Sequence, residues 1–319
     1  MPLDPQAQRL LDAAAASGLP PVHLLPVPEA RARMIAAFVT GVAPEPVHDI
    51  RNGSIPGPGG DLPIRVYTPA PQSSLPVFVF FHGGGWTLNN LDTHDGICRS
   101  IANMAQCIVV AVDYRLSPEH KFPIPVEDAY VATQWVVNNA TKINADPARV
   151  AVGGDSSGGN QAAAVALLSR DRGGPNIVYQ VLVYPVTDYY LPGTPSYEEH
   201  GTGYSLTRDA MIWFWNNYLP IGADPSNPYI SPLRAQDLRH LPPSLILTGE
   251  FDPLRDEGEQ FAAKLREAGI SVRLTRYEGM MHGFLLQFRT MDRGRLALAE
   301  IADGLRAAFG VTPARKYCD

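Results

Sequence analysis

Short apolar runs alternate with longer amphipathic segments along most of the chain, from residue 77 onward. The apolar runs have the length of β-strands and lie near residues 77–81, 108–113, 150–153, 178–184, 244–248 and 272–277. The longer segments have the spacing of helices and lie near residues 93–105, 126–140, 156–172, 254–267 and 295–309. Such alternation predicts an α/β fold, with a mostly parallel sheet and helices on both of its faces.

The amino-terminal part of the chain has a different pattern. Two stretches, 5–16 and 28–40, carry apolar residues at helical spacing. Neither stretch alternates with a strand, so we expect both helices to cover the fold rather than to belong to its core. Two segments with period-two spacing, near 48–55 and 62–68, flank a Pro/Gly-rich turn at 56–60 and predict an antiparallel start to the sheet.

The connection between the strands at 178–184 and 244–248 is about 60 residues long, and such excess length usually carries function. This insertion is rich in aromatic residues, namely Tyr189, Tyr190, Tyr197, Tyr204, Trp213, Phe214, Trp215 and Tyr218. A helix is expected at 207–219, and aromatic residues at helical spacing are typical of a core. We therefore expect most of them to pack the helix onto the sheet and a few to line a pocket.

Composition narrows the class of protein. A chain of 319 residues with this alternation fits a single α/β domain over residues 1–319. Its net charge of -6 argues against nucleic acid and anionic membranes as partners. The three cysteines, Cys98, Cys107 and Cys318, give an odd count without the spacing of metal ligands, which favours a reducing compartment, no structural disulfide and no metal.

We expect no targeting segment from the sequence. Asp4 follows Met1 closely, and charges interrupt the apolar positions of the amino terminus, so we expect no signal peptide. No apolar run approaches the length of a transmembrane helix. These features together predict a cytoplasmic protein.

The most informative stretch is residues 154–158 (GDSSG), where Ser156 stands between an apolar strand and an alanine-rich helix. Glycine two positions away on each side permits a turn that is too tight for other side chains. This arrangement is typical of the nucleophile elbow, which lifts a serine hydroxyl above the edge of a sheet. One alternative is a Gly/Ser-rich connection without a chemical role.

A second alternative is a chymotrypsin-like protease, whose GDSGG motif is similar to the GDSSGG of this chain. His82 and Asp113 precede the serine in the order that those proteases require. Those proteases are all-β, however, and the helix-length alanine run after Ser156 cannot be a barrel strand. The sequence therefore favours the elbow.

Candidate partners of Ser156 follow it in the order acid, then base. Asp252 lies in the loop just past the strand at 244–248, where catalytic groups of open α/β sheets collect. The alternatives are that Asp252 only caps the following helix, or that Glu250 is the acid. His282 lies in a glycine-flanked loop past the next strand and is the only histidine after the proposed acid. The sequence therefore predicts a triad of Ser156, His282 and Asp252.

A further motif follows the strand at 77–81. Residues 82–86 (HGGGW) contain three successive glycines, whose backbone N–H groups no side chain shields. Fixed N–H donors are what an oxyanion hole requires. The alternatives are a flexible loop or a phosphate-binding loop, but the Lys-Ser/Thr of a P-loop and the G-x-G-x-x-G spacing of dinucleotide folds are both absent.

Taken in order, these motifs resemble those of the hormone-sensitive-lipase family of α/β-hydrolase carboxylesterases, in its bacterial type. The resemblance spans about residues 63–284 and rests on HGGGW at 82–86, DYRLSPEH at 113–120, GDSSGG at 154–159, SPL at 231–233, LPP at 241–243, DPLRDEG at 252–258 and HGF at 282–284. It implies the α/β-hydrolase fold, with a mostly parallel central sheet, helices on both faces and a helical cap.

The resemblance also implies roles for individual residues. The nucleophile, acid and base, followed by the three backbone N–H donors of the oxyanion hole, fall on Ser156, Asp252, His282, Gly83, Gly84 and Ser157. The family more often has alanine where this chain has Ser157. Because the donor is a backbone group, we expect this serine to leave the mechanism intact and to add a second hydroxyl near the elbow.

A cap over the active site is also implied, formed by about residues 1–45 and 188–225. Candidate residues of the substrate pocket are Trp86, Leu206, Met211, Trp213 and Phe284. The expected partner is a small-molecule ester rather than nucleic acid or a membrane, and a homodimer is a candidate assembly.

The expected activity is hydrolysis of short- to medium-chain soluble esters through an acyl-enzyme, without a cofactor or metal. Among enzymes, the alternative is an amidase, lactonase or peptidase on the same fold, because the triad does not dictate the acyl group. The alternative outside enzymes is a ligand-binding receptor. Plant gibberellin receptors resemble this family but lack the catalytic histidine, which this chain has as His282.

Overall fold

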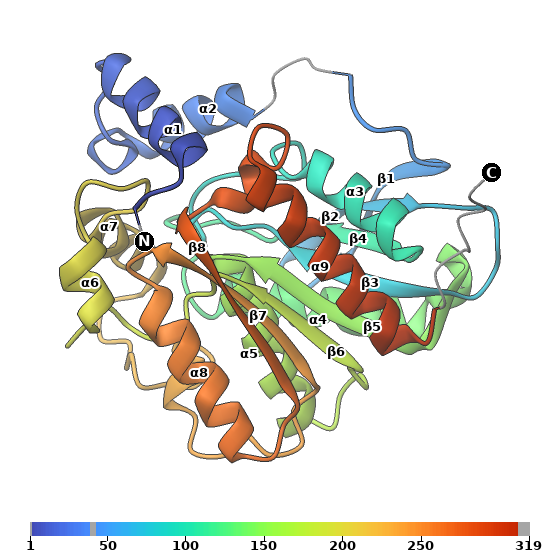
Figure 1. Cartoon of the computed structure of the whole chain (residues 1–319). Helices are drawn as coiled ribbons and strands as arrows, with labels where there is room; N and C mark the ends of the chain where they lie inside the picture. The colour runs from blue at the N-terminus through green and yellow to red at the C-terminus, as the bar shows by residue number, and fades with distance from the viewer. Residues whose placement is uncertain (1, 39–42, 312–319) are drawn as a thin grey trace.

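An eight-stranded sheet forms the centre of the computed structural model, which describes residues 2–38 and 43–311 (Figure 1). In chain order, the strands are β1 Asp49–Gly57, β2 Gly60–Thr68, β3 Leu75–Phe81, β4 Ile108–Val112, β5 Ala145–Asp155, β6 Tyr179–Val183, β7 Ser244–Phe251 and β8 Val272–Met281. Their order in the sheet is β1-β2-β4-β3-β5-β6-β7-β8. Neighbours from β4 to β8 are parallel, whereas β2 is antiparallel to both of its neighbours. The predicted parallel sheet with an antiparallel start is confirmed.

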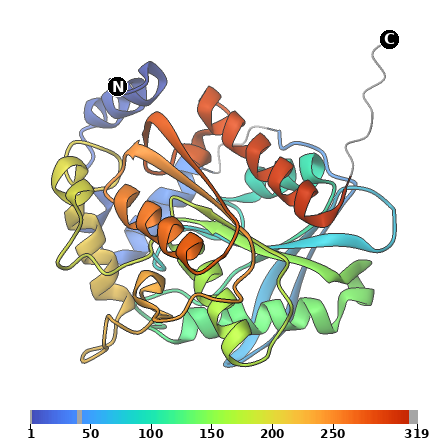
Figure 2. The same ribbon diagram turned by 60° about the horizontal axis from the view of Figure 1, so that its bottom comes forward.

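Helices cover both faces of this sheet, as the alternating pattern predicts (Figures 1 and 2). One face is covered by α3 Asp95–Ala105 and α9 Asp292–Phe309, and the other by α4 Ile124–Asn138, α5 Ser157–Asp171 and α8 Arg255–Glu267. Within the described residues, no helix is both long and apolar enough to cross a membrane.

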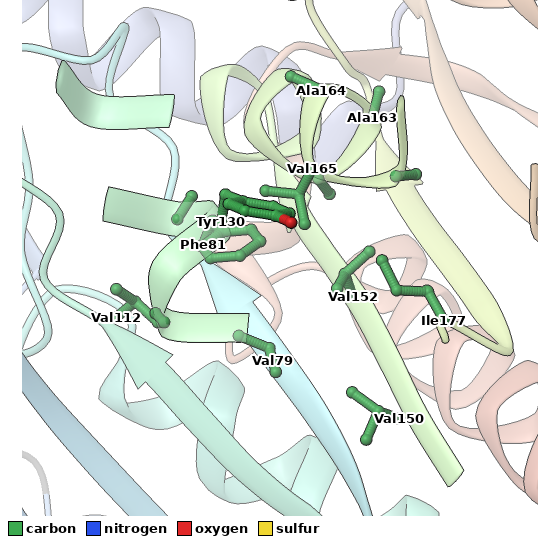
Figure 3. Close-up of a cluster of buried hydrophobic side chains, with 14 of the residues drawn as sticks. Val79, Phe81, Val112, Tyr130, Val150, Val152, Ala163, Ala164, Val165 and Ile177 are labelled. Atoms are coloured by element: carbon green, nitrogen blue, oxygen red, sulfur yellow. The ribbon is translucent and has the colours of Figure 1, made fainter. Parts of the chain in front are cut away.

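The hydrophobic core divides into two layers because successive side chains of a strand point to opposite faces. In β3, Val79 and Phe81 pack toward α4 and α5, while Phe78 and Phe80 pack toward α3 and α9. Figure 3 shows part of the first layer, with Val79 and Phe81 on the sheet and Val165 on α5. The central strands are thus buried on both faces, which is why they appear in the sequence as continuous apolar runs.

Several strands extend beyond the ends that the sequence pattern predicts, among them β5, which begins at Ala145, and β7, which ends at Phe251. β8 continues past Tyr277 to Met281, because its backbone goes on pairing with β7 beyond an irregularity in the register. His282 consequently follows the strand directly. The hairpin between β1 and β2 is also tighter than predicted, since the strands pair up to Gly57 and Gly60 and leave only residues 58 and 59 for the loop.

The two segments predicted to form a cap pack against each other (Figure 1). The first contains α1 Pro5–Ala16, a 3-10 helix Val22–Leu24 and α2 Val27–Phe38, and the second contains α6 Pro195–His200 and α7 Arg208–Tyr218. Ala30 of α2 shares a buried cluster with Trp86 and with Trp215 and Tyr218 of α7. The expectation that most aromatic residues of the insertion serve as core is confirmed for these two. The end of the predicted helix at 28–40 lies outside the described residues.

We expect Gly158→Ala to destabilise the fold, because a Cβ at this position would lie 2.0 Å from the carbonyl oxygen of Phe81 in β3. The backbone of α5 approaches the sheet too closely for a side chain, so a packed element must shift. The loss should be roughly 1–3 kcal/mol in the free energy of unfolding, measured by urea denaturation.

The control for this change is Gly53→Ala in β1, where a Cβ would meet nothing within 4 Å. It should alter the free energy of unfolding by less than about 0.5 kcal/mol. Equal stability of the two variants would show that the close approach of α5 and β3 does not constrain the fold.

Candidate active site

Ser156 follows the last residue of β5 in a strained turn. Its φ of 57° and ψ of -121° lie in a region that residues other than glycine rarely occupy. The Ser156 N–H donates to the carbonyl oxygen of Val183 at 2.8 Å, which holds the turn against β6. A Cβ at Gly154 would lie 2.2 Å from the carbonyl oxygen of Phe81. The backbone therefore passes too close to β3 for anything but glycine, as the predicted elbow requires.

The hydroxyl of Ser156, the imidazole of His282 and the carboxylate of Asp252 form one line of hydrogen bonds. His282 Nε2 lies 2.9 Å from Ser156 Oγ, and His282 Nδ1 lies 2.7 Å from Asp252 Oδ2. Asp252 is fully buried, and its Oδ1 accepts the N–H of Leu254 at 2.9 Å. One carboxylate thus both orients the imidazole and stabilises the turn before α8. The three residues predicted as a triad meet in space.

Glu250, the competing acid, has a different partner. Its Oε2 accepts the N–H of Gly279 at 2.7 Å, so it fixes the β8 backbone. A residue that the sequence did not point to lies beside the imidazole instead: the ring of Tyr184 packs on His282 with centroids 4.6 Å apart. Tyr184 comes directly after β6, and position at a strand end was the one signal that could have identified it.

His82 and Asp113, which matched the order of the protease alternative, lie next to each other. His82 Nε2 is 3.8 Å from Asp113 Oδ1, and His82 Nδ1 is 2.8 Å from the carbonyl oxygen of Gly83. Burial, together with the neighbouring His94, lowers the pKa of His82 to about 4, so this imidazole is neutral at pH 7. The parallel sheet and the helix after Ser156 exclude the all-β protease fold.

The predicted oxyanion donors need one correction. The Gly83 N–H donates to the buried Asp155 Oδ1 at 2.8 Å, so it is already engaged. Gly84 and Gly85, with φ of 122° and 58°, line the same cavity as Ser156, and their N–H groups have no acceptor among the described residues. The N–H of Ser157, the first residue of α5, also has no partner within the helix. The donors that the geometry supports are Gly84, Gly85 and Ser157.

The residues on either side of Ser156 hold the glycine loop at its two ends. Asp155 accepts the Gly83 N–H, and it lies 3.1 Å from Nε2 of the buried His94. Burial by itself raises the pKa of Asp155, but His94 and the Gly83 N–H outweigh it and lower the pKa below the ordinary value. Ser157 Oγ accepts the Trp86 N–H at 3.1 Å. The second hydroxyl near the elbow is therefore fully buried and anchors the loop.

A cavity of about 530 Å³ extends from Ser156 and His282 between the two cap segments. Of the predicted pocket residues, it is lined by Leu206, Met211 and Phe284. Trp86 and Trp213 are not part of its lining, so these two predictions are wrong. Trp86 is fully buried and stacks on Tyr218 with ring centroids 4.1 Å apart, and Trp213 packs against Phe214.

Several residues of the lining were not predicted, chiefly Leu10 and Leu11 of α1, Met34 of α2 and Phe214 of α7. Nothing in their local sequence separates them from helix residues that face the core. Only tertiary packing, of α1 against β8 and of α2 against α7, brings them to one cavity.

The described residues contain no group of three or more His, Cys, Asp or Glu side chains placed to hold a metal ion. Cys98 and Cys107 are buried free thiols. Cys318 lies outside the described residues.

Comparisons with known proteins agree with the fold. The family model described as alpha/beta hydrolase fold matches residues 78–286. The carboxylic ester hydrolase LipN of Mycobacterium tuberculosis is 42% identical over 312 residues, which cover 96% of this chain and 83% of LipN. The carboxylesterase NlhH of the same organism is 46% identical over 230 residues, 70% of this chain and 72% of NlhH. A solved hyperthermophilic esterase from the archaeon Pyrobaculum calidifontis is 41% identical, with a TM-score of 0.93 over 98% of this chain and 100% of its own.

The chain therefore belongs to the α/β-hydrolase family, in its hormone-sensitive-lipase branch, as the sequence motifs predict.

Glu257 carries a second buried carboxyl group, close to the carboxylate of Asp252. It is fully buried, and its Oε1 accepts the N–H of Thr187 at 2.7 Å and of Asp188 at 3.2 Å. Burial raises the pKa of Glu257 well above its ordinary value of 4.5, and the charges of Asp188 and Asp252 add to this rise. The folded protein thus binds this proton more tightly than the unfolded chain does.

Glu257→Gln should therefore change how stability depends on pH. Because folding raises the pKa of Glu257, the protonated side chain stabilises the native protein at low pH. The contribution of Glu257 to the free energy of unfolding therefore falls as the pH rises above about 4.5. Glutamine cannot ionise and keeps an amide oxygen for the two N–H groups, so the variant should gain stability relative to the native protein between pH 5 and pH 8. Urea denaturation at both pH values measures this, with the exposed Glu267→Gln on α8 as the control. A gap between native protein and variant that is constant with pH would contradict the raised pKa.

Proposed function

We propose that this protein is a serine carboxylesterase that hydrolyses short- and medium-chain, water-soluble esters through an acyl-enzyme. The observation that carries the proposal is the line from Asp252 through His282 to Ser156 Oγ, at the end of a largely apolar cavity. The class of enzyme, carboxylic ester hydrolase, rests on the family and on the relatives named as such.

In the proposed acylation step, His282 Nε2 takes the proton from Ser156 Oγ as this oxygen attacks the ester carbonyl carbon. Asp252 holds the proton of His282 on Nδ1, which leaves Nε2 as the base, and it stabilises the imidazolium that forms. The carbonyl oxygen becomes an oxyanion, and the N–H groups of Gly84, Gly85 and Ser157 donate to it. Because Ser157 begins the fifteen-residue helix α5, the positive end of the helix dipole favours the same negative charge.

Collapse of the tetrahedral intermediate breaks the bond to the alcohol oxygen, and His282 gives its proton to the departing alcohol. The acyl group then remains on Ser156 Oγ. Water enters, loses a proton to His282 and attacks the acyl carbon, and the same N–H groups stabilise the second oxyanion. Release of the acid returns the proton to Ser156.

The shape of the cavity supports soluble substrates. Its volume of about 530 Å³ is bounded by α1, α2 and α7, and most of its lining is apolar. Such a cavity buries a short or medium acyl chain under the cap and presents the ester to Ser156. A long-chain fat in an emulsion would have to reach the site from an interface, and that route needs an opened cap.

Two alternatives remain testable on the same site. An amidase, lactonase or peptidase would use the same residues, and only the substrate distinguishes it from an esterase. A ligand-binding receptor of this fold needs no base, whereas here His282 Nε2 lies within hydrogen-bond distance of Ser156 Oγ. That distance favours an enzyme.

Ser156→Ala should lower turnover of a p-nitrophenyl ester by roughly a million-fold, as removal of a triad serine does in comparable hydrolases. A fluorophosphonate should label the native protein at Ser156 and leave Ser157 unmodified, because the Ser157 hydroxyl is buried against the Trp86 N–H. Peptide mass spectrometry identifies the labelled residue. Labelling at Ser157, or unchanged turnover in the variant, would refute the assignment of the nucleophile.

Rates on p-nitrophenyl esters of increasing acyl length should be highest near butyrate and hexanoate and should fall for long chains. The rate should not jump when the substrate exceeds its solubility limit, and chelators should leave it unchanged because no metal takes part in the proposed steps. The matched test uses tributyrin solutions against long-chain triglyceride emulsions. Higher activity on the emulsion would make the protein a lipase whose cap opens onto a lipid surface.

A further inference from the structure

Arg31 of the cap helix α2 reaches across to the body of the hydrolase. Its Nε donates to the carbonyl oxygen of Thr87 at 2.8 Å, and its Nη2 donates to the carbonyl oxygen of Ser117 at 2.8 Å. The same guanidinium forms a two-pronged ion pair with Glu119, with distances of 2.9 and 2.7 Å. Arginine is suited to such a site because its five N–H groups form a rigid planar fork.

Thr87 belongs to the turn that carries the oxyanion glycines. Its N–H and that of Leu88 both donate to the carbonyl oxygen of Gly84, at 3.1 and 2.8 Å, and its hydroxyl donates to the carbonyl oxygen of Gly85 at 3.0 Å. Ser117 binds the same turn, because its N–H donates to the carbonyl oxygen of Trp86 at 2.8 Å. Arg31 therefore holds two backbone groups that are themselves bonded to the turn.

The remaining anchors of this turn come from the body of the fold. Asp155, Ser157, Ser117 and Asn89 bind it from the strands and loops below. Within the described residues, Arg31 is the one side chain of α1 or α2 that forms a hydrogen bond to it. Arg31 also supplies the only hydrogen bonds that connect the described part of α2 to the body.

From these contacts, and building on the proposed function, we infer that Arg31 is a positioning residue that couples closure of the cap to the geometry of the oxyanion hole. It touches no reacting atom. It fixes Thr87 and Ser117 when α2 is docked, and through them it fixes the N–H groups of Gly84 and Gly85.

Glycines at positive φ make this coupling necessary. Gly84 and Gly85 have no side chains that could pack and hold their N–H groups, so these groups depend on the bonds of neighbouring residues. An oxyanion hole works because its donors are in place before charge develops. Small displacements of such groups reduce the rate of the chemical step far more than they reduce binding of the uncharged ester.

The experiment compares Arg31→Ala with the native enzyme on a soluble p-nitrophenyl ester. We expect kcat to fall by about tenfold to a hundredfold, less than the loss expected for a deleted donor, while KM changes by less than about threefold. A trifluoromethyl ketone, which forms an oxyanion on Ser156, should lose affinity by the same factor as kcat/KM. The corresponding methyl ketone with its uncharged carbonyl should bind as before.

Three further variants control the result. Arg9→Ala removes an exposed arginine of α1 and should leave kcat unchanged. Glu119→Gln keeps both carbonyl acceptors of Arg31 and should lose clearly less than Arg31→Ala. Arg31→Lys keeps the charge but replaces the planar fork with a single nitrogen, so its kcat should fall between those of the native enzyme and Arg31→Ala. It remains informative if the alanine variant does not fold.

Several outcomes would overturn the inference. They are a kcat within twofold of native for Arg31→Ala or Arg31→Lys, a loss confined to KM, or an equal loss of affinity for both ketones. A loss in Glu119→Gln as large as that in Arg31→Ala would assign the effect to docking by the ion pair alone. An inactive native protein would instead refute the proposed function and is recognised before any variant is made.

Discussion

The site depends on one constraint: the turn after β5 passes very close to the end of β3. At Gly154 and Gly158, the distance to the carbonyl oxygen of Phe81 leaves no room for a Cβ. The chain must therefore turn sharply between these glycines, and Ser156 takes a strained backbone conformation at the top of that turn. Because β3 continues directly into the glycine loop, the same contact also sets how far the oxyanion donors lie from the nucleophile.

Polar groups buried under the glycine loop make this arrangement rigid. Asp155 has no access to water, yet its carboxylate is satisfied by His94 and by the Gly83 N–H. On the other side of the nucleophile, the buried hydroxyl oxygen of Ser157 accepts the N–H of Trp86. Asp155 and Ser157, before and after the nucleophile, thus fix the two ends of the glycine loop. Between these ends, the N–H groups of Gly84 and Gly85 stay available to a substrate.

The cap contributes to this scaffold as well as to the cavity. Its helices supply apolar walls, and α2 adds Arg31, which binds the far side of the glycine loop. On the proposed function, binding of an ester under the cap and positioning of the oxyanion hole are linked in one structure. Such linkage favours an ester that lets α2 dock closely, since only then are all the anchors of the loop made.

The sequence by itself determined the fold class, the approximate positions of the strands along the chain and the positions of Ser156, Asp252 and His282. These follow from local patterns, namely burial with a fixed period, tight turns at glycine and the ends of strands, all of which a short window of sequence contains. Only the tertiary structure decided which glycine N–H groups are free, because Gly83 is engaged by Asp155, 72 residues away. The tertiary structure also decided the lining of the cavity, where α1 and α2 meet α7. It placed Trp86 in the core rather than in that lining. Such contacts depend on distances between segments far apart in the chain, and no local pattern records those distances.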